Sequence, residues 1–189
     1  MIMKGATGLK DEIPQLVGQR AGNIYHAHRL CCSESLLLTL NMSFGGELTP
    51  ETAVRIGSGF CEGLGGAGCL CGSLSSACIV LNLFLGPGQP GGLSRRRMKT
   101  ITRKMHDRFK ERFGSTCCRV LTKKVRHDKK LKRANCRNLT EGGAELAAGI
   151  LLEIRPDLAR LVDMDFLRSQ DTALSGVCNR LRSFKTCRK

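Results

Sequence analysis

The chain has 189 residues, enough for one folded domain or for one domain with an appended piece. Its formal net charge is +15 at pH 7, and its eleven cysteines are an odd number, so at least one stays unpaired within the chain. Residues 1–17 carry charges and a proline and lack the apolar stretch of a secretory signal. We therefore expect a cytoplasmic protein whose cysteines serve metal binding or thiol redox chemistry, with a framework of structural disulfides as the less favoured alternative.

The N-terminal part predicts a leader followed by one helix. Residues 1–19 read as a loose leader, and a helical pattern begins near Arg20. Apolar residues then recur at three- and four-residue spacing, which predicts a helix that fades over residues 41–45. This helix would carry Cys31 and Cys32 in its middle.

The stretch from Gly57 to Gly86 is the most informative part of the sequence. A glycine-rich loop and the apolar run after it contain four cysteines: Cys61, Cys69, Cys71 and Cys78. The uncharged run predicts a buried central helix at about 73–86, which we prefer to a membrane span because its apolar core has only about a dozen residues. Cys71 would then lie at or just before a helix N-terminus, where the helix dipole stabilises a thiolate and lowers its pKa.

The rest of the chain also predicts helices. They are expected at 94–114, from Thr140 to about residue 154, at 156–167 and at 172–184. Cys117 and Cys118 would lie in a turn, with a basic connection from there to Cys136. Since no stretch alternates as a strand does, we expect an all-α fold. We divide it into a leader (1–19), a cysteine-rich helical redox domain around the central helix (20–154) and a C-terminal helical extension (155–189).

The positive charge is concentrated in one segment. Between Ser94 and Arg137 there are 18 Lys or Arg residues against three acidic ones, which accounts for the whole net charge. The segment predicts a surface for nucleic acid, an acidic protein or a phosphorylated molecule, or else a solvated helix face and a basic loop. It has no Trp or Tyr to stack on bases, which argues against nucleic acid. Arg119 and Arg137 are expected to favour thiolates at Cys118 and Cys136.

Taken singly, the cysteines match no familiar ligand motif. There is no C-x-x-C pair and no C-x-x-C-H, so neither a thioredoxin-type pair nor a haem c attachment is encoded. His28 and Cys32 are four residues apart and would share a helix face, so they are either an acid–base or ligand pair or ordinary surface residues.

Taken in order, the cysteine segments resemble a known family. The segments are Leu30-Cys31-Cys32-Ser33-Glu34-Ser35, the glycine-rich loop to Cys71-Gly72-Ser73, Phe113-Gly114-Ser115 with Cys118-Arg119, and Cys136 before a Leu/Ala-rich helix. This order resembles the bacterial and archaeal redox-active family named for its C_GCAxxG_C_C pattern, over about residues 20–152. Ser73 stands where the pattern has Ala, and Ser76 where it has Gly.

The resemblance implies a site of four cysteines: Cys32, Cys71, Cys118 and Cys136. Cys31 and Cys117 are the alternatives within their pairs. The family is similar to split-Soret cytochrome c, which carries an iron–sulfur centre besides its haems. This implies a [2Fe–2S] or [4Fe–4S] cluster, with zinc as a further possibility, in electron transfer or redox sensing with a redox partner protein. If no metal is bound, the protein would instead be a thiol–disulfide oxidoreductase that uses these four cysteines, with Cys71 as the nucleophile.

Overall fold

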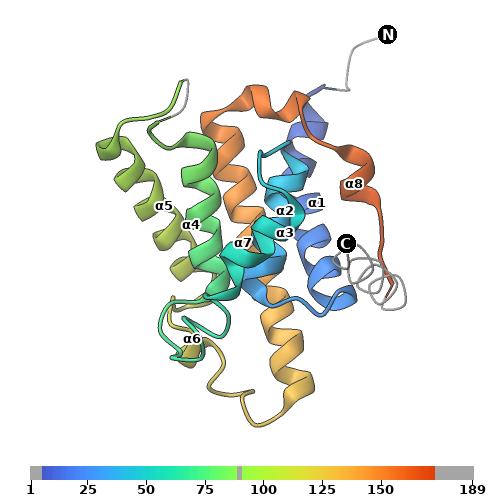
Figure 1. Ribbon diagram of the computed structural model, residues 1–189, viewed down its shortest axis with the longest axis vertical. Helices are drawn as coiled ribbons and strands as arrows, with labels where there is room; N and C mark the ends of the chain where they lie inside the picture. The colour runs from blue at the N-terminus through green and yellow to red at the C-terminus, as the bar shows by residue number, and fades with distance from the viewer. Residues whose placement is uncertain (1–5, 89–90, 173–189) are drawn as a thin grey trace, which may run out of the picture.

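Helices make up nearly all the regular structure of the computed structural model, which describes residues 6–88 and 91–172 (Figure 1). They are α1 (Ala6–Ala27), α2 (Cys32–Ser43), α3 (Pro50–Ser58), α4 (Gly72–Leu85), α5 (Arg95–Phe113), α6 (Cys118–Leu121), α7 (Lys129–Ile154), the 3-10 helix η1 (Pro156–Arg160) and α8 (Met164–Arg168). These described ranges contain no strand, and the all-α fold class is confirmed.

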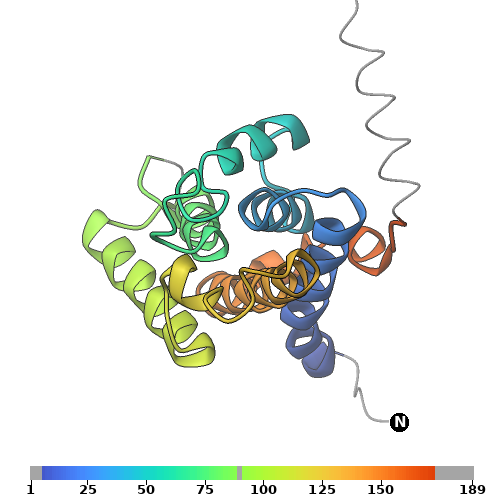
Figure 2. The ribbon, with the colours of Figure 1, turned by 90° about the horizontal axis from the view of Figure 1, so that it is seen from below.

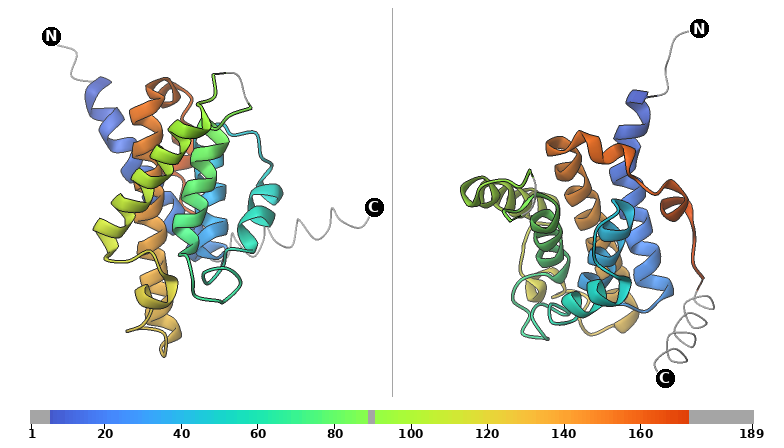
Figure 3. Two further views of the ribbon diagram at one scale, coloured as in Figure 1. Left: turned by 90° about the vertical axis from the view of Figure 1, so that its left-hand side faces the viewer. Right: turned by 45° about the horizontal axis from the view of Figure 1, so that its top comes forward.

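The long helix α7 lies at the centre of the bundle. It packs against α1, α2, α4 and α5, and the view from below shows it between α5 on one side and α1 on the other (Figure 2). The helices α2, α4 and α7 begin at the lower end of Figure 1, whereas α1 and α5 run down toward it. The short α3 covers the outer side of α2 (Figure 3). The N-termini of three core helices are therefore gathered at one end of the molecule.

The helix expected at about 73–86 is α4. It is buried where it faces α2, α7 and α5, but Asn82 and Leu83 are exposed on its outer side. The central position expected for it belongs to α7 instead. None of the helices in the described ranges has the combined length and hydropathy that a bilayer span requires.

The amphipathic helix expected at 94–114 is present as α5. The Ser94 hydroxyl accepts a hydrogen bond from the Arg97 backbone N–H, which caps the N-terminus. Gly114 ends the helix in the left-handed conformation, with a φ of 79°. The buried face consists of Met98, Ile101, Met105 and Phe109. Local capping signals and helical periodicity agree here, so the sequence was sufficient to locate the helix.

The N-terminal predictions are wrong in two respects. Residues 1–19, expected as a loose leader, are helical from Ala6 on, because Ile13 and Val17 are buried in the core where α1 packs against α7. The single helix expected from Arg20 is two helices, α1 and α2. Between them Arg29 has a φ of 55°, a left-handed conformation that interrupts the α-helix.

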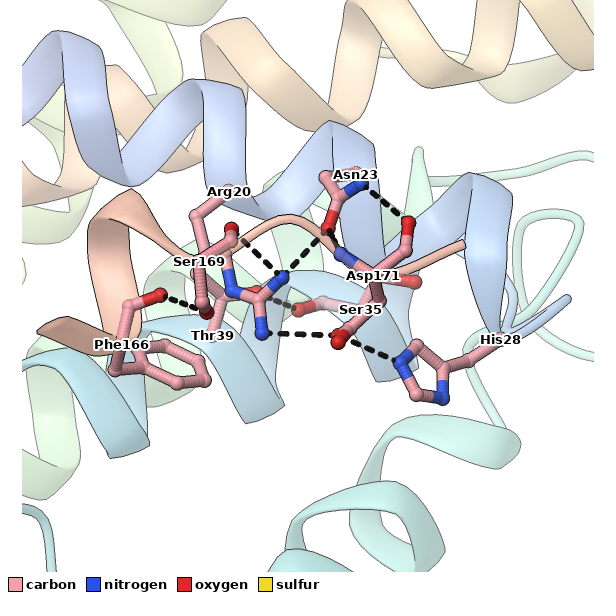
Figure 4. Close-up of polar contacts among 8 residues, drawn as sticks. All are labelled: Arg20, Asn23, His28, Ser35, Thr39, Phe166, Ser169 and Asp171. Carbon is pink, nitrogen blue, oxygen red and sulfur yellow. Dashed lines mark hydrogen bonds and ion pairs between the residues drawn. The ribbon is translucent and has the colours of Figure 1, made fainter. Parts of the chain in front are cut away.

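The C-terminal extension expected at 155–189 joins the main core as far as it is described. Leu158 of η1 and Leu167 of α8 are buried in the same hydrophobic cluster as the bundle helices. Beyond α8, Asp171 pairs with Arg20 and His28 of the N-terminal segment at 2.9 and 2.8 Å (Figure 4). The helix expected at 172–184 lies almost wholly outside the described residues.

Candidate functional site

Four unbonded cysteines from four separate segments line one pocket of about 400 Å³. They are Cys32, Cys71, Cys118 and Cys136, the four named from the sequence. None of the four is disulfide-bonded. The pocket is lined by residues at or near the starts of α2, α4, α6 and α7. The fold thus brings together thiols that are far apart in the sequence.

Three of these cysteines lie at helix N-termini. Cys71 is the N-cap of α4, as expected, and Cys32 and Cys118 are the first residues of α2 and α6. Cys32 is therefore not in mid-helix, because the expected first helix breaks just before it. Cys136 lies inside α7, which begins at Lys129 and not at Thr140 as expected. The expected basic connection is thus partly helix.

A short backbone pairing joins the Cys71 and Cys118 segments. Leu70 and Cys117 form an isolated antiparallel bridge. The Cys71 N–H donates to the Thr116 carbonyl oxygen at 2.8 Å, and the Cys118 N–H donates to the Cys69 carbonyl oxygen at 2.9 Å. These bonds hold the glycine-rich loop against the start of α6, and so place two pocket thiols side by side in the fold.

Gly72 allows the first turn of α4 to approach the segment that carries Cys32. A Cβ atom on Gly72 would lie 2.7 Å from the Cys32 sulfur and 2.8 Å from the Phe60 carbonyl oxygen. Both distances are shorter than any side chain tolerates, so the first turn of α4 can contact Cys32 only with glycine at this position. The glycine that follows the central cysteine is a packing requirement of the site.

Burial keeps the pocket thiols protonated. It raises the pKa of Cys32 to about 12 and those of Cys118 and Cys136 to about 11. Each of the six pairs among the four cysteines also interacts electrostatically, and a thiolate at one position raises the pKa of another. The four thiols therefore lie close enough together for a thiolate at one position to disfavour a thiolate at the others.

The lowered pKa expected for Cys71 is wrong. Burial raises the pKa of this thiol, although hydrogen bonds from the Ser73 and Leu74 backbone N–H groups act in the opposite direction. Cys71 is only 3% exposed. Desolvation therefore outweighs the helix N-terminus at this position.

The cations beside the pocket are not those expected. Lys132 lowers the pKa values of Cys118 and Cys136, against the larger effect of burial. Arg119 donates to the Ala67 carbonyl oxygen at 2.8 Å, and Arg137 pairs with Glu141 within α7. Neither of these arginines lines the pocket, whereas Lys129, Lys132 and Arg133 do.

The two members of each adjacent cysteine pair, Cys31/Cys32 and Cys117/Cys118, have different surroundings. Cys31 forms a disulfide with Cys61, which leaves Cys32 as the unbonded thiol of its pair. The Cys117 sulfur donates to the Gly68 carbonyl oxygen at 3.2 Å, whereas Cys118 lines the pocket. The disulfide contradicts the sequence argument against such bonds. Sequence reasoning missed it, because the spacing of Cys31 and Cys61 carries no signal of their proximity.

His28 and Cys32, expected to share one helix face, lie on either side of the start of α2. The helix break between α1 and α2 means that the two residues do not share a helix face. His28 instead forms an ion pair with Asp171, in a network that includes Arg20 and Asn23 (Figure 4). Cys78 is half-buried on α4 and does not line the pocket, while Cys178 and Cys187 lie outside the described residues.

Comparison with known proteins gives one match. The sequence profile of the family described as "Putative redox-active protein (C_GCAxxG_C_C)" matches residues 30–150, which include all four pocket cysteines. No curated protein and no solved structure matches the chain. The match extends over more than half of the 189 residues.

Proposed function

Because the chain belongs to the C_GCAxxG_C_C redox-active family, we propose that its four pocket cysteines hold an iron–sulfur cluster used in electron transfer or redox sensing. The residues that would hold it are Cys32, Cys71, Cys118 and Cys136. The observation that carries the proposal is the convergence of four unbonded thiols from four segments on one pocket. Clusters of the [2Fe–2S] and [4Fe–4S] types are held by four cysteine thiolates.

The spread of the sulfurs favours a cluster over a single zinc ion. A tetrahedral zinc site with Zn–S bonds of about 2.3 Å holds its sulfurs only about 3.8 Å apart. Among the residues that the structure describes, no three of the four pocket sulfurs lie within 4.8 Å of one another. A cluster places irons and sulfides between its thiolates, so its ligands lie further apart than those of one ion. The donor set therefore suits a cluster, and the spacing of the sulfurs does not suit a single zinc ion.

The chain's own contribution is to hold, shield and partly neutralise the thiolates. A cluster bound there would supply one-electron chemistry. Cys32 and Cys71 are 9% and 3% exposed, so bulk water is kept from these sulfurs. The Ser73 and Leu74 N–H groups point at Cys71, and hydrogen bonds to cluster thiolates tune the reduction potential. Lys132 opposes part of the negative charge.

The same burial makes these thiols poor nucleophiles in the absence of metal. The thiolate is the reactive form, and pKa values of about 11 and 12 leave few thiolates at neutral pH. A metal-free oxidoreductase acting through Cys71 is therefore the second candidate. Metal binding removes the thiol protons and compensates the buried negative charge, which a metal-free mechanism cannot do.

The proposed function and the basic segment 94–137 together indicate what kind of partner protein would bind. A cluster that transfers electrons needs a redox partner protein. On α5, Lys104 and Arg108 both pair with Glu153 of α7, which neutralises part of the basic segment. Arg95, Arg96 and Arg97 are exposed at the start of the helix. Docking of an acidic partner on residues 94–137 stays a prediction.

The test is an absorption spectrum of anaerobically purified protein, with iron, zinc and acid-labile sulfide measured on the same sample. We expect visible charge-transfer bands and matching amounts of iron and sulfide. Cys71→Ser and Cys136→Ser should lose both, whereas Cys78→Ser, a change outside the pocket, should keep them. Colourless protein that contains zinc or no metal would refute the cluster.

A further inference from the structure

The Cys31–Cys61 disulfide adjoins the four-thiol pocket. It joins the N-cap residue of α2 to the loop that follows α3, with 5.8 Å between the two Cα atoms. Both cysteines are half-buried, and Cys31 lines the wall of the pocket. A reagent that enters the pocket therefore contacts one cysteine of the disulfide.

The surrounding contacts hold α2 and α3 together without this bond. A Cβ atom on Gly57 would lie 2.8 Å from the Glu34 Cα atom, so the end of α3 packs directly on the first turn of α2. The Ser33 hydroxyl donates to the Gly57 carbonyl oxygen at 2.8 Å. The Ser58 hydroxyl donates to Glu34 Oε1 at 2.7 Å. Opening the disulfide would leave these contacts in place, so the fold does not require it to stay closed.

Two polar side chains adjoin the sulfurs. The Ser33 hydroxyl oxygen lies 3.0 Å from the Cys31 sulfur and 3.6 Å from the Cys61 sulfur. A carboxylate oxygen of Glu34 and the two sulfurs all lie within 4.8 Å of one another. The Cys31 N–H donates to Glu34 Oε2 at 2.8 Å, which fixes the carboxylate beside the disulfide. The Ser33 hydroxyl and the Glu34 carboxylate thus both adjoin the disulfide.

We propose that Cys31 and Cys61 form a second redox site, a dithiol–disulfide couple that exchanges two electrons with an external dithiol. The couple uses none of the four pocket cysteines, so it goes beyond the cluster proposed above. Cys31 is the sulfur that is attacked, because it lines the pocket.

The reaction proceeds in two exchanges. In the first, one thiol of the dithiol loses its proton to solvent and its sulfur attacks Cys31. The Cys31–Cys61 bond breaks, and Cys61 leaves as a thiolate that takes up a proton from solvent. In the second, the other thiol of the reductant attacks the mixed disulfide and releases Cys31, which takes up that thiol's proton. The protein gains two electrons and two protons, and the reductant becomes a cyclic disulfide.

The experiment equilibrates the purified full-length protein in mixtures of reduced and oxidised dithiothreitol. Acid quenching, alkylation and peptide mass spectrometry then give the redox state of each cysteine, and circular dichroism reports the fold. We expect Cys31 and Cys61 to convert together in one two-electron transition with an unchanged helical spectrum. A disulfide that opens only on unfolding, or a Cys31 that is alkylated before any reductant is added, would overturn the proposal.

Matched variants assign the roles. Glu34→Gln keeps a hydrogen-bond acceptor for the Cys31 N–H but removes the carboxylate charge beside the sulfurs, so Cys31 and Cys61 should still convert together in one two-electron transition. Cys78→Ser should behave as the unchanged protein.

The test of the Cys31–Cys61 couple can fail independently of the test of the iron–sulfur cluster. A colourless, metal-free protein with a reversible Cys31–Cys61 couple would refute the cluster alone. Conversely, an iron-loaded protein with an inert disulfide would refute the second redox site alone. Cys61→Ser should keep the iron and sulfide content, because Cys61 does not line the pocket.

Discussion

Replacing Gly72 by alanine tests the contact between the first turn of α4 and the Cys32 thiol. The added methyl group would lie 2.7 Å from the Cys32 sulfur and 2.8 Å from the Phe60 carbonyl oxygen. The second contact is with backbone and cannot be relieved by a change of rotamer. Insertion of a methyl group into packing of this kind costs about 1–3 kcal/mol.

A second glycine separates this steric cost from the effect of alanine on the helix itself. Alanine is favoured over glycine inside a helix by about 0.5–1 kcal/mol. Gly149 lies in α7, and nothing lies within 4 Å of a Cβ atom built on it. Gly149→Ala should therefore stabilise the protein by about that amount. Gly72→Ala should destabilise it, because the steric cost exceeds the gain in helix propensity.

Thermal and urea unfolding of the two variants provide the measurement. At about 2–4 °C per kcal/mol for a chain of this size, Gly149→Ala should raise the Tm by a few degrees and Gly72→Ala should lower it by about as much or more. Iron and sulfide content should fall in Gly72→Ala alone, because the thiols are displaced. Equal stabilisation by both changes would show that Cys32 does not pack against α4 as described.

Further predictions concern charge and thiol chemistry. Asp171→Asn leaves the buried Arg20 guanidinium without its ion pair and should lower the free energy of unfolding in urea by about 2 kcal/mol. This is less than the cost for a fully buried pair, because Asp171 is a quarter exposed. The control Asp107→Asn, on an exposed surface, should leave the urea midpoint unchanged. Burial acts to raise the pKa of Asp171, but the His28 hydrogen bond and the Arg20 charge outweigh it and hold the pKa below its usual value. The stability difference between the parent and Asp171→Asn should therefore be fully present above about pH 4 and disappear as the pH falls through the lower, folded-state pKa; a difference that grows on acidification would contradict this. In metal-free protein, a Cys118 pKa of about 11 predicts alkylation about a hundredfold faster at pH 10 than at pH 8 by peptide mass spectrometry, and a rate that does not change with pH would contradict the burial argument.

The sequence predicted features that depend on neighbouring residues. The bounds of α5 followed from a serine N-cap, a helical apolar pattern and a terminal glycine. The position of Cys71 at the start of α4 followed from the end of a glycine-rich loop and the beginning of an apolar run. In both cases the signal lies within one turn or one helix, where propensity and capping act directly.

Features that depend on distant contacts were not predictable in this way. The break between α1 and α2 involves Arg29 in a left-handed conformation, for which the sequence has neither glycine nor proline as a marker. The early start of α7 is set by the Asp128 side chain, which accepts from two backbone N–H groups within a run of charged residues that resembles a loop. The pairing of Cys31 with Cys61 requires α3 to pack on α2. The raised pKa of Cys71 depends on burial, which a local motif does not report.

The helix break also explains how two adjacent cysteines can take part in two different sites. In mid-helix, consecutive side chains point about 100° apart and share one local environment. At the start of α2, Cys31 is the N-cap in extended backbone, whereas Cys32 has entered the helix. The first bonds to Cys61 beside α3, and the second packs against Gly72 of α4. The change from extended to helical backbone between the two residues therefore separates the dithiol couple from the proposed cluster ligand, although both line the same pocket.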